Sequence, residues 1–116
     1  MAHDAPLVIK RQEGKVPGTR ILWLTGPLTL RNLFDFQGEL RGFETPKVTI
    51  VDLAGVPYMD SAGMGALINY HVHCEKAGKK MIVSAVSSRV MELFRMTKVD
   101  TVIAQAESVE AAQRQA

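Results

Sequence analysis

The chain has 116 residues, of which 47% are hydrophobic and 22% charged, and its formal net charge is +2. This length and composition predict a single globular domain over residues 1–116 and exclude disorder for most of it. The basic residues are scattered, no apolar run reaches the roughly 18–20 residues of a membrane span, and no signal peptide is recognisable. We therefore expect a cytoplasmic protein with no nucleic-acid partner and no membrane span.

The first part of the chain predicts a β-hairpin and then a helix. After a loose N-terminus at 1–6, strands at 7–12 and 20–25 flank a turn that contains glycine and proline. Thr29 is the candidate N-cap of a helix over 30–43. Five residues of that helix fall near helical spacing and predict one apolar stripe: Leu30, Leu33, Phe34, Gln37 and Leu40.

The rest of the chain alternates strands with helices. Strand 48–53 is a nearly continuous apolar run, which is typical of a central strand buried on both faces. A helix over 62–77 follows and ends before Gly78, a residue suited to the left-handed position after a helix. The remaining expected elements are strand 81–86, a helix to 96 capped by Ser87 or Ser88, strand 101–104 and a last helix from Ser108. The order predicts an α/β fold whose later strands are parallel.

A serine follows the central strand, at the expected start of the helix over 62–77. Loops 25–29, 54–61 and 85–89 should meet at the carboxyl ends of the strands, where α/β proteins place their functional sites. Ser61 in the middle loop has two roles open to it. It caps the helix with its oxygen, or it accepts a phosphate that the helix N-terminus would stabilise, and the two roles do not exclude each other.

The residues around Ser61 favour contact with a partner over catalysis. Asp60 could be a second cap, a metal-binding acid or a partner contact. Gly63 and Gly65 fail as a nucleotide loop or a nucleophile elbow because further glycines would have to replace Ile68 or Met59. We expect these small residues to leave the first helical turn open to a docking surface. Two methionines, Met59 and Met64, would flank that surface as adaptable apolar contacts.

A metal or catalytic site is weakly supported. His71, Cys74 and Glu75 have i, i+3, i+4 spacing on one helix, but a zinc site needs three or four ligands and the only other histidines are His73 and His3. No Ser–His–Asp arrangement can be proposed from these residues. The single cysteine cannot form an internal disulfide. We expect no metal, no cofactor and no enzymatic activity.

The run D-L-A-G-V-P-Y-M-D-S-A-G-M-G-A-L at 52–67 resembles the signature of STAS domains of the bacterial anti-sigma factor antagonist family. The resemblance extends to Thr25-Gly26, to M-T-K-V at 96–99 and to the closing helix at 107–112, and Asp52 stands at its family position. Lys98-Val99 replaces the family's usual Gly-Leu, and P-L-T-L after Gly26 replaces a commoner acidic segment.

The resemblance implies a STAS-like mixed sheet of about five strands and about four helices, with an N-terminal hairpin followed by parallel β-α units. It implies a module that binds an anti-sigma factor serine kinase and is switched off when that kinase phosphorylates Ser61. The alternative is a non-catalytic STAS scaffold or an accessory subunit of a signalling or lipid-transport complex. Monomer and weak homodimer both remain open. The expected partner-binding residues are Thr25, Gly26, Tyr58, Met59, Asp60, Ser61, Gly63 and Met64.

Overall fold

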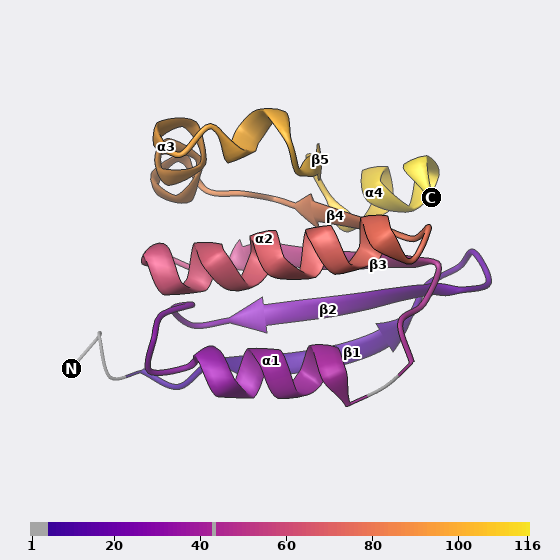
Figure 1. The fold of residues 1–116 in the computed structure, drawn as a ribbon, viewed down its shortest axis with the longest axis horizontal. Coiled ribbons are helices and arrows are strands. Elements are labelled where there is room, and N and C mark those ends of the chain that lie inside the picture. The colour runs from indigo at the N-terminus through magenta and orange to yellow at the C-terminus, as the bar shows by residue number, and fades with distance from the viewer. Residues whose placement is uncertain (1–4, 43) are drawn as a thin grey trace.

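The computed structural model describes residues 5–42 and 44–116. They form one five-stranded mixed sheet in the order β1-β2-β3-β4-β5 (Figure 1). The first two strands are an antiparallel hairpin, and each later neighbour pairs in parallel. The predicted fold class is therefore confirmed. The strands are β1 (Val8–Glu13), β2 (Thr19–Thr25), β3 (Val48–Gly55), β4 (Lys80–Ser84) and β5 (Ala104–Ala106).

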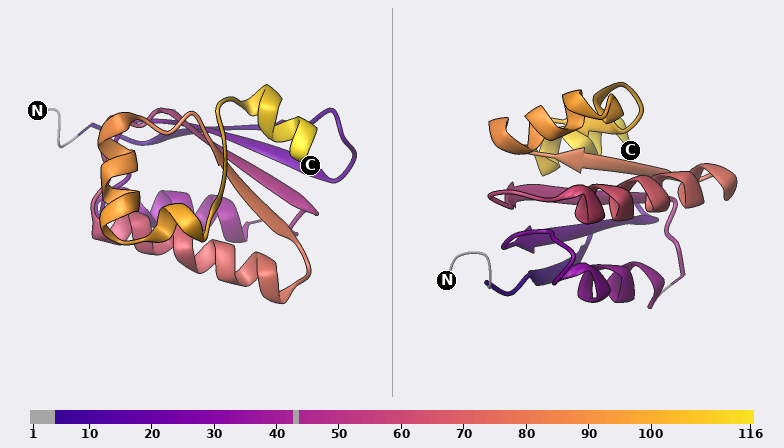
Figure 2. Two further views of the ribbon diagram at one scale, coloured as in Figure 1. Left: turned by 90° about the horizontal axis from the view of Figure 1, so that it is seen from above. Right: turned by 60° about the vertical axis from the view of Figure 1, so that its left-hand side comes forward.

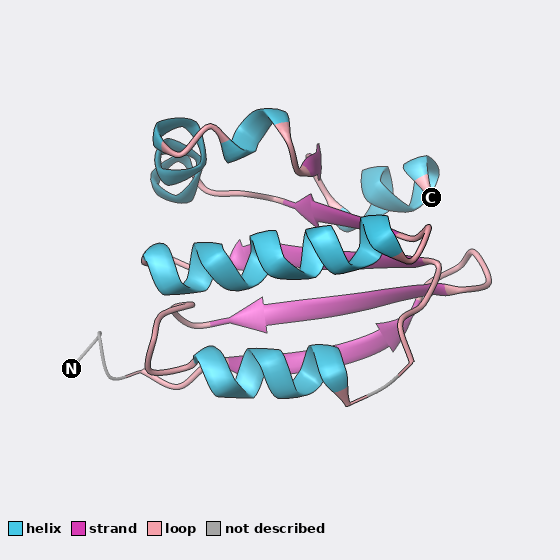
Figure 3. Ribbon diagram, viewed as in Figure 1, coloured by secondary structure: helices cyan, strands magenta, loops and turns pink. Residues whose placement is uncertain are grey.

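In the described part of the chain, four α-helices and a short 3-10 helix connect or follow the parallel strands (Figure 3). The first two helices lie side by side on one face of the sheet, and the last lies on the opposite face (Figures 1 and 2). They are α1 (Leu33–Arg41), α2 (Ser61–Lys76), α3 (Ser88–Met96), η2 (Val99–Thr101) and α4 (Val109–Gln115).

Alternation along the strands divides the buried residues between the two faces of the sheet. Ile50 of β3 joins a small cluster with Val109 and Ala112 of α4. Its neighbour Val51 joins the large cluster under the other helices, which includes Phe36 of α1. Successive residues of a strand point to opposite faces, so β3 is buried on both, as its apolar run predicts.

The first helix is shorter than expected and presents a different side to the core. It begins at Leu33, and its N-cap is Asn32 in place of Thr29. The Asn32 side-chain amide Nδ2 donates a 2.7 Å hydrogen bond to the Pro27 carbonyl, which holds the preceding segment as a turn. The expected apolar stripe was wrong in part: Leu30 and Phe34 are 64% and 78% exposed, whereas Phe36 is fully buried. The expected end of this helix at Phe43 lies outside the described residues.

The fifth strand begins three residues later than the expected 101–104 and ends two residues later. Lys98 has a left-handed backbone with φ 60° after the end of α3, and the 3-10 helix η2 follows it directly. Val99 and Ile103 are buried on either side of η2 at 6% and 3% exposure. Their burial fixes a helical turn where the sequence pattern predicted a strand.

We expect Lys98→Gly to stabilise the protein by about 0.5–1 kcal/mol, because a side chain at positive φ costs energy that glycine avoids. Gly78→Ala is the matched reverse change. Gly78 has φ +70° and a Cβ there would meet no atom within 4 Å, so only the backbone is strained. Urea unfolding of both variants measures the effect. Equal or lower stability of the Lys98→Gly variant would contradict this account of the turn.

Candidate functional site

Three loops meet at the carboxyl ends of the parallel strands, as the sequence predicts. The β2–α1 loop and the β3–α2 loop are joined by a parallel bridge between Leu28 and Met59. Backbone hydrogen bonds run from the Leu28 amide to the Tyr58 carbonyl at 3.2 Å and from the Asp60 amide to the Leu28 carbonyl at 3.3 Å. The Arg89 guanidinium, on α3, lies 5.0 Å from the centre of the Tyr58 ring. Because α3 begins directly after the β4–α3 loop, this contact connects the third loop to the other two.

Asp60 holds the start of α2 and the β2–α1 loop together. Its Oδ1 accepts a 2.9 Å hydrogen bond from the Gly63 amide, which makes Asp60 the N-cap of the helix. Its Oδ2 accepts a 3.1 Å hydrogen bond from the Leu30 amide. One carboxylate therefore satisfies backbone donors on two segments that are 30 or more residues apart from each other in the chain. The structure thus confirms the role of cap for Asp60, while its contact with a partner stays a prediction.

Ser61 is the first residue of α2 and is exposed. The expectation that Ser61 caps the helix was wrong, because Asp60 occupies the capping position. Within residues 5–42 and 44–116, the Ser61 hydroxyl takes part in none of the side-chain hydrogen bonds. The hydroxyl therefore lies in the first turn of a 16-residue helix and does not contribute a hydrogen bond to the fold. The positive end of the helix dipole favours negative charge at that position.

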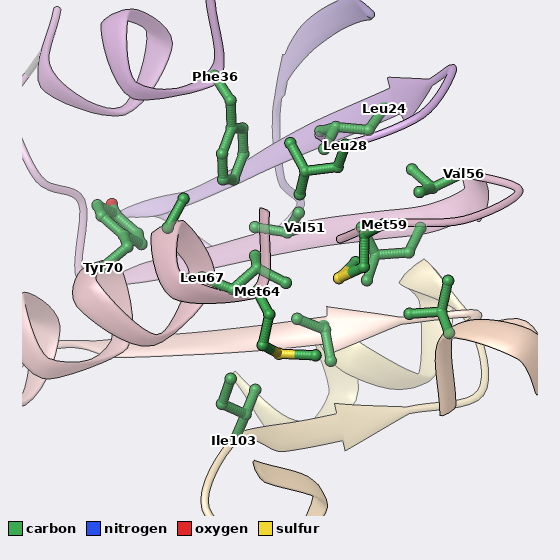
Figure 4. Packing of buried hydrophobic residues seen from close by; sticks show 14 of the residues in the cluster. Leu24, Leu28, Phe36, Val51, Val56, Met59, Met64, Leu67, Tyr70 and Ile103 are labelled. Carbon is green, nitrogen blue, oxygen red and sulfur yellow. The ribbon is translucent and has the colours of Figure 1, made fainter. Parts of the chain in front are cut away.

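Gly63 and the two methionines face the interior, contrary to the expected docking surface. A Cβ on Gly63 would lie 2.2 Å from the Leu28 carbonyl oxygen, so glycine is needed for the close approach of helix and loop. Met59 and Met64 are 9% and 2% exposed and belong to the core (Figure 4). The partner contact expected of these three residues is therefore corrected to a packing role. Gly65, by contrast, faces open space.

The other expected contact residues remain accessible to different degrees. Thr25 is exposed, and Tyr58 is half-buried beneath Arg89. Gly26 is half-buried at φ +109°, and a Cβ there would lie 2.3 Å from the Pro6 carbonyl oxygen. Its role is thus to let the loop pass the N-terminal segment. The sequence analysis missed Arg89. The feature that could have identified it is a basic residue in the first turn of a helix that begins beside loop 54–61.

Asp52 is buried beneath the site and is not part of its surface. It is 5% exposed, its Oδ1 accepts a 2.9 Å hydrogen bond from the Ser84 hydroxyl, and its Oδ2 accepts one from the Ala54 amide at 3.2 Å. Asp52 and Ser84 are register partners on β3 and β4. The pair therefore ties together the ends of the two strands that lead into the β3–α2 and β4–α3 loops.

A sequence profile of the STAS domain matches residues 11–112 of this chain. The chain belongs to the STAS domain family. The profile spans every strand at least in part, and it includes both carboxylates described above and the serine of the α2 N-terminus.

Solved structures of proteins with different printed names share this fold. An anti-sigma factor antagonist from Mycobacterium paratuberculosis superposes with a TM-score of 0.84 at 14% identity, covering 94% of this chain and 92% of that one. A sulfate transporter family protein from Wolinella succinogenes gives 0.76 at 28% identity, covering 87% and 88%. The murine anion transporter solute carrier 26 family member A9 gives 0.74 at 18% identity, covering 96% of this chain and 22% of that chain. The matches below 25% identity establish the shared fold.

No helix in the described part of this STAS domain combines the length and the apolar character needed to cross a membrane. Among the described residues, no three histidine, cysteine, aspartate or glutamate side chains are grouped so that they could hold a metal ion. His71 Nε2 lies 2.6 Å from Glu75 Oε1, and Cys74 is buried.

A groove of about 420 Å³ separates the facing sides of α1 and α2. Tyr70 lies at this groove, and its hydroxyl shares a 2.8 Å hydrogen bond with the Thr49 hydroxyl. Burial raises the pKa of Tyr70 to about 12, against the opposing effect of the Thr49 hydrogen bond. Burial also raises the pKa of the Cys74 thiol. The groove is lined by Gln37, Leu40, Arg41, Glu44, Thr45, Ala66, Asn69, Tyr70 and His73.

We expect the free energy of unfolding to fall at alkaline pH. The folded state holds the Tyr70 proton more tightly than the unfolded chain, so this stability is fully present below pH 10 and is lost as the pH rises towards 12. Tyr70→Phe should flatten that decline and leave the smaller contribution of Cys74. Urea unfolding at a series of pH values between 8 and about 11 tests this. An identical decline in the Tyr70→Phe variant would show that Tyr70 is not its source.

Proposed function

We propose that this STAS domain is an anti-sigma factor antagonist, a regulatory module that binds an anti-sigma factor kinase and is released when Ser61 is phosphorylated. The observation that carries the proposal is the free, exposed hydroxyl of Ser61 at the start of α2, beside a carboxylate that already caps the helix. A residue with no role in holding the fold is available for modification. The printed function of the Mycobacterium paratuberculosis relative supports the same reading.

The chemistry of the switch is a phosphoryl transfer. The Ser61 oxygen would form a bond to the γ-phosphorus of ATP as the bond to the leaving ADP breaks, and the hydroxyl proton would pass to a base of the kinase. The product adds about −1.5 to −2 charges at neutral pH. Asp60 is adjacent in sequence, so the phosphate would lie beside an existing carboxylate. The added charge would have to lose its water in the complex, so the phosphorylated surface would bind the partner less well without any change in the core.

The direct test is phosphate mapping after incubation of this domain with ATP and an anti-sigma factor serine kinase from the same organism. We expect phosphate on Ser61 and none on the Ser61→Ala variant, with mass spectrometry as the readout. Ser88, an exposed serine in the first turn of α3, is the internal control for specificity. Phosphate on Ser88 or elsewhere, with Ser61 unmodified, would overturn the proposal.

A second candidate function is that of a STAS scaffold or accessory module in an anion-transport assembly. The Wolinella succinogenes protein favours it, since its printed name is that of a sulfate transporter family member and its identity to this chain is 28%. The two functions differ in what Ser61 does. An accessory module should bind its membrane partner equally well as wild type, as Ser61→Ala and as Ser61→Asp. An antagonist should bind its kinase as Ser61→Ala and lose that binding as Ser61→Asp.

A further inference from the structure

The groove between α1 and α2 has the size and the lining of a site for a small molecule. Its volume of about 420 Å³ falls within the range of about 300–1,000 Å³ that is typical of such sites. The two helices lie side by side on one face of the sheet (Figure 1), and residues of both line the groove. Ala66 and Tyr70 are buried, whereas Arg41, Glu44 and Asn69 are exposed. The groove therefore has an apolar floor and a polar rim.

Two aromatic side chains of α2 lie at this groove, and the fold already engages a polar atom of each. The ring centres of Tyr70 and His73 lie 5.9 Å apart, with 32° between the ring planes. The Tyr70 hydroxyl shares its hydrogen bond with Thr49, and His73 Nε2 lies 2.9 Å from the Thr45 hydroxyl. What Tyr70 offers to a ligand is therefore its ring. Aromatic rings pack well against a further ring in an offset or edge-to-face arrangement, so this floor fits an aromatic side chain.

The rim carries one positive and one negative side chain that the fold leaves unpaired. Arg41 lies in the last turn of α1, and Glu44 follows three residues later. Across residues 5–42 and 44–116, neither side chain takes part in an ion pair or a hydrogen bond. A guanidinium binds a carboxylate through two parallel hydrogen bonds, and a carboxylate accepts strong hydrogen bonds from an ammonium group. The rim thus offers a partner to each charge of a zwitterion.

Two amide side chains, Gln37 of α1 and Asn69 of α2, complete the rim on its two sides. An amide side chain both donates and accepts, so it can bind either polar end of a ligand. Other ligand classes fit this lining less well. A phosphate or a sulfate would meet the Glu44 carboxylate, a like charge, and a lipid chain would leave the polar rim without partners.

We propose that the groove binds a free amino acid with an aromatic side chain, whose carboxylate contacts Arg41, whose ammonium contacts Glu44 and whose ring packs on Tyr70 and His73. The site is separate from the Ser61 site. His73 follows Ser61 by twelve residues on α2, which corresponds to about 18 Å along the helix axis. The proposal therefore does not depend on the proposed function.

The experiment titrates the whole chain with L-phenylalanine and follows the backbone amides by two-dimensional NMR, which detects millimolar binding. Three further probes each lack one feature of the ligand: 3-phenylpropionate has no ammonium, phenethylamine has no carboxylate, and L-leucine has no ring. We expect L-phenylalanine to shift the amides of Ala66, Asn69 and Tyr70 in a saturable way and to leave Ser61 unchanged. Each other probe should bind at least about tenfold more weakly, because each loses one contact.

Two variants assign the charged contacts. Arg41→Gln should weaken binding of L-phenylalanine at least about tenfold and leave phenethylamine, which has no carboxylate, unaffected. Glu44→Gln should weaken L-phenylalanine in the same way and leave 3-phenylpropionate unaffected. Arg95→Gln is the matched control, since Arg95 lies in the last turn of α3 and outside the groove. Unchanged binding of one probe, together with circular dichroism, shows that a variant is folded.

Each of four results would overturn the proposal. They are the absence of saturable binding of L-phenylalanine to the wild type at millimolar concentrations, shifts confined to the Ser61 end of α2, equal affinity for L-leucine and L-phenylalanine, and equal binding of L-phenylalanine by wild type and Arg41→Gln. None of these results bears on the phosphorylation of Ser61, so the antagonist function is tested separately.

Discussion

Gly63→Ala should destabilise the protein by roughly 3 kcal/mol or more, a cost at the upper end for an overpacked core position. The added Cβ would lie 2.2 Å from the Leu28 carbonyl oxygen, and this atom belongs to the backbone. The same oxygen accepts the Asp60 amide, so moving it also disturbs the junction between the β2–α1 and β3–α2 loops. Urea unfolding monitored by circular dichroism gives the difference in free energy.

Gly65→Ala is the matched control in the same helical turn. A Cβ at Gly65 would meet no atom within 4 Å, so the substitution changes only the helical preference of the chain. Alanine is better than glycine in a helix interior by about 0.8–1 kcal/mol, and we expect a gain of that order. If both alanine variants unfold at the same urea concentration, the close packing of Gly63 against Leu28 is not what the position requires.

Asp60→Ala should cost about 2 kcal/mol. It removes the N-cap acceptor of the Gly63 amide, worth about 1 kcal/mol, and the separate acceptor of the Leu30 amide, worth a similar amount. The second loss has its own readout in amide hydrogen exchange. The Leu30 amide should exchange slowly in wild type and much faster in the variant.

The control for Asp60→Ala lies elsewhere in the same protein. The Val90 amide donates to the Ser87 hydroxyl at 3.2 Å at the start of α3, and its exchange should be unaffected. Asp60→Asn keeps one oxygen acceptor and should lose only part of the stability. Unchanged exchange at Leu30 in Asp60→Ala would mean that the carboxylate does not hold the β2–α1 loop.

The arrangement of strands and helices was predictable because it follows from periodicity. The apolar run of β3 requires burial on both faces, and Gly78 has the positive φ that its place after a helix predicts. The α3 cap was also predictable as one of two serines, and Ser87 accepts the Val90 amide. These features depend on residues close together in the sequence, where local rules apply.

The details of the site depended on contacts between distant segments, which no local pattern encodes. Asp60 and Ser61 are both good caps, and the choice between them is settled by the Leu30 amide from another loop. Position 63 requires glycine because the Leu28 carbonyl approaches it closely. In the sequence, a glycine needed for such close packing cannot be told apart from a glycine that leaves a surface open. Phe34 and Phe36 are two residues apart on one helix, and only the packing of the core decides which is buried.

The central claim is that phosphorylation of Ser61 releases this domain from its kinase, and it is simple to test because Ser61 is the only serine of the motif. The measurement is the affinity of the anti-sigma factor kinase for two purified forms of this domain, one unmodified and one carrying phosphate on Ser61, by calorimetry at one salt concentration. We predict that the phosphorylated form binds more than about 100-fold more weakly, because burying an unpaired charge at an interface costs several kcal/mol. Equal affinity of the kinase for the two forms would contradict the account.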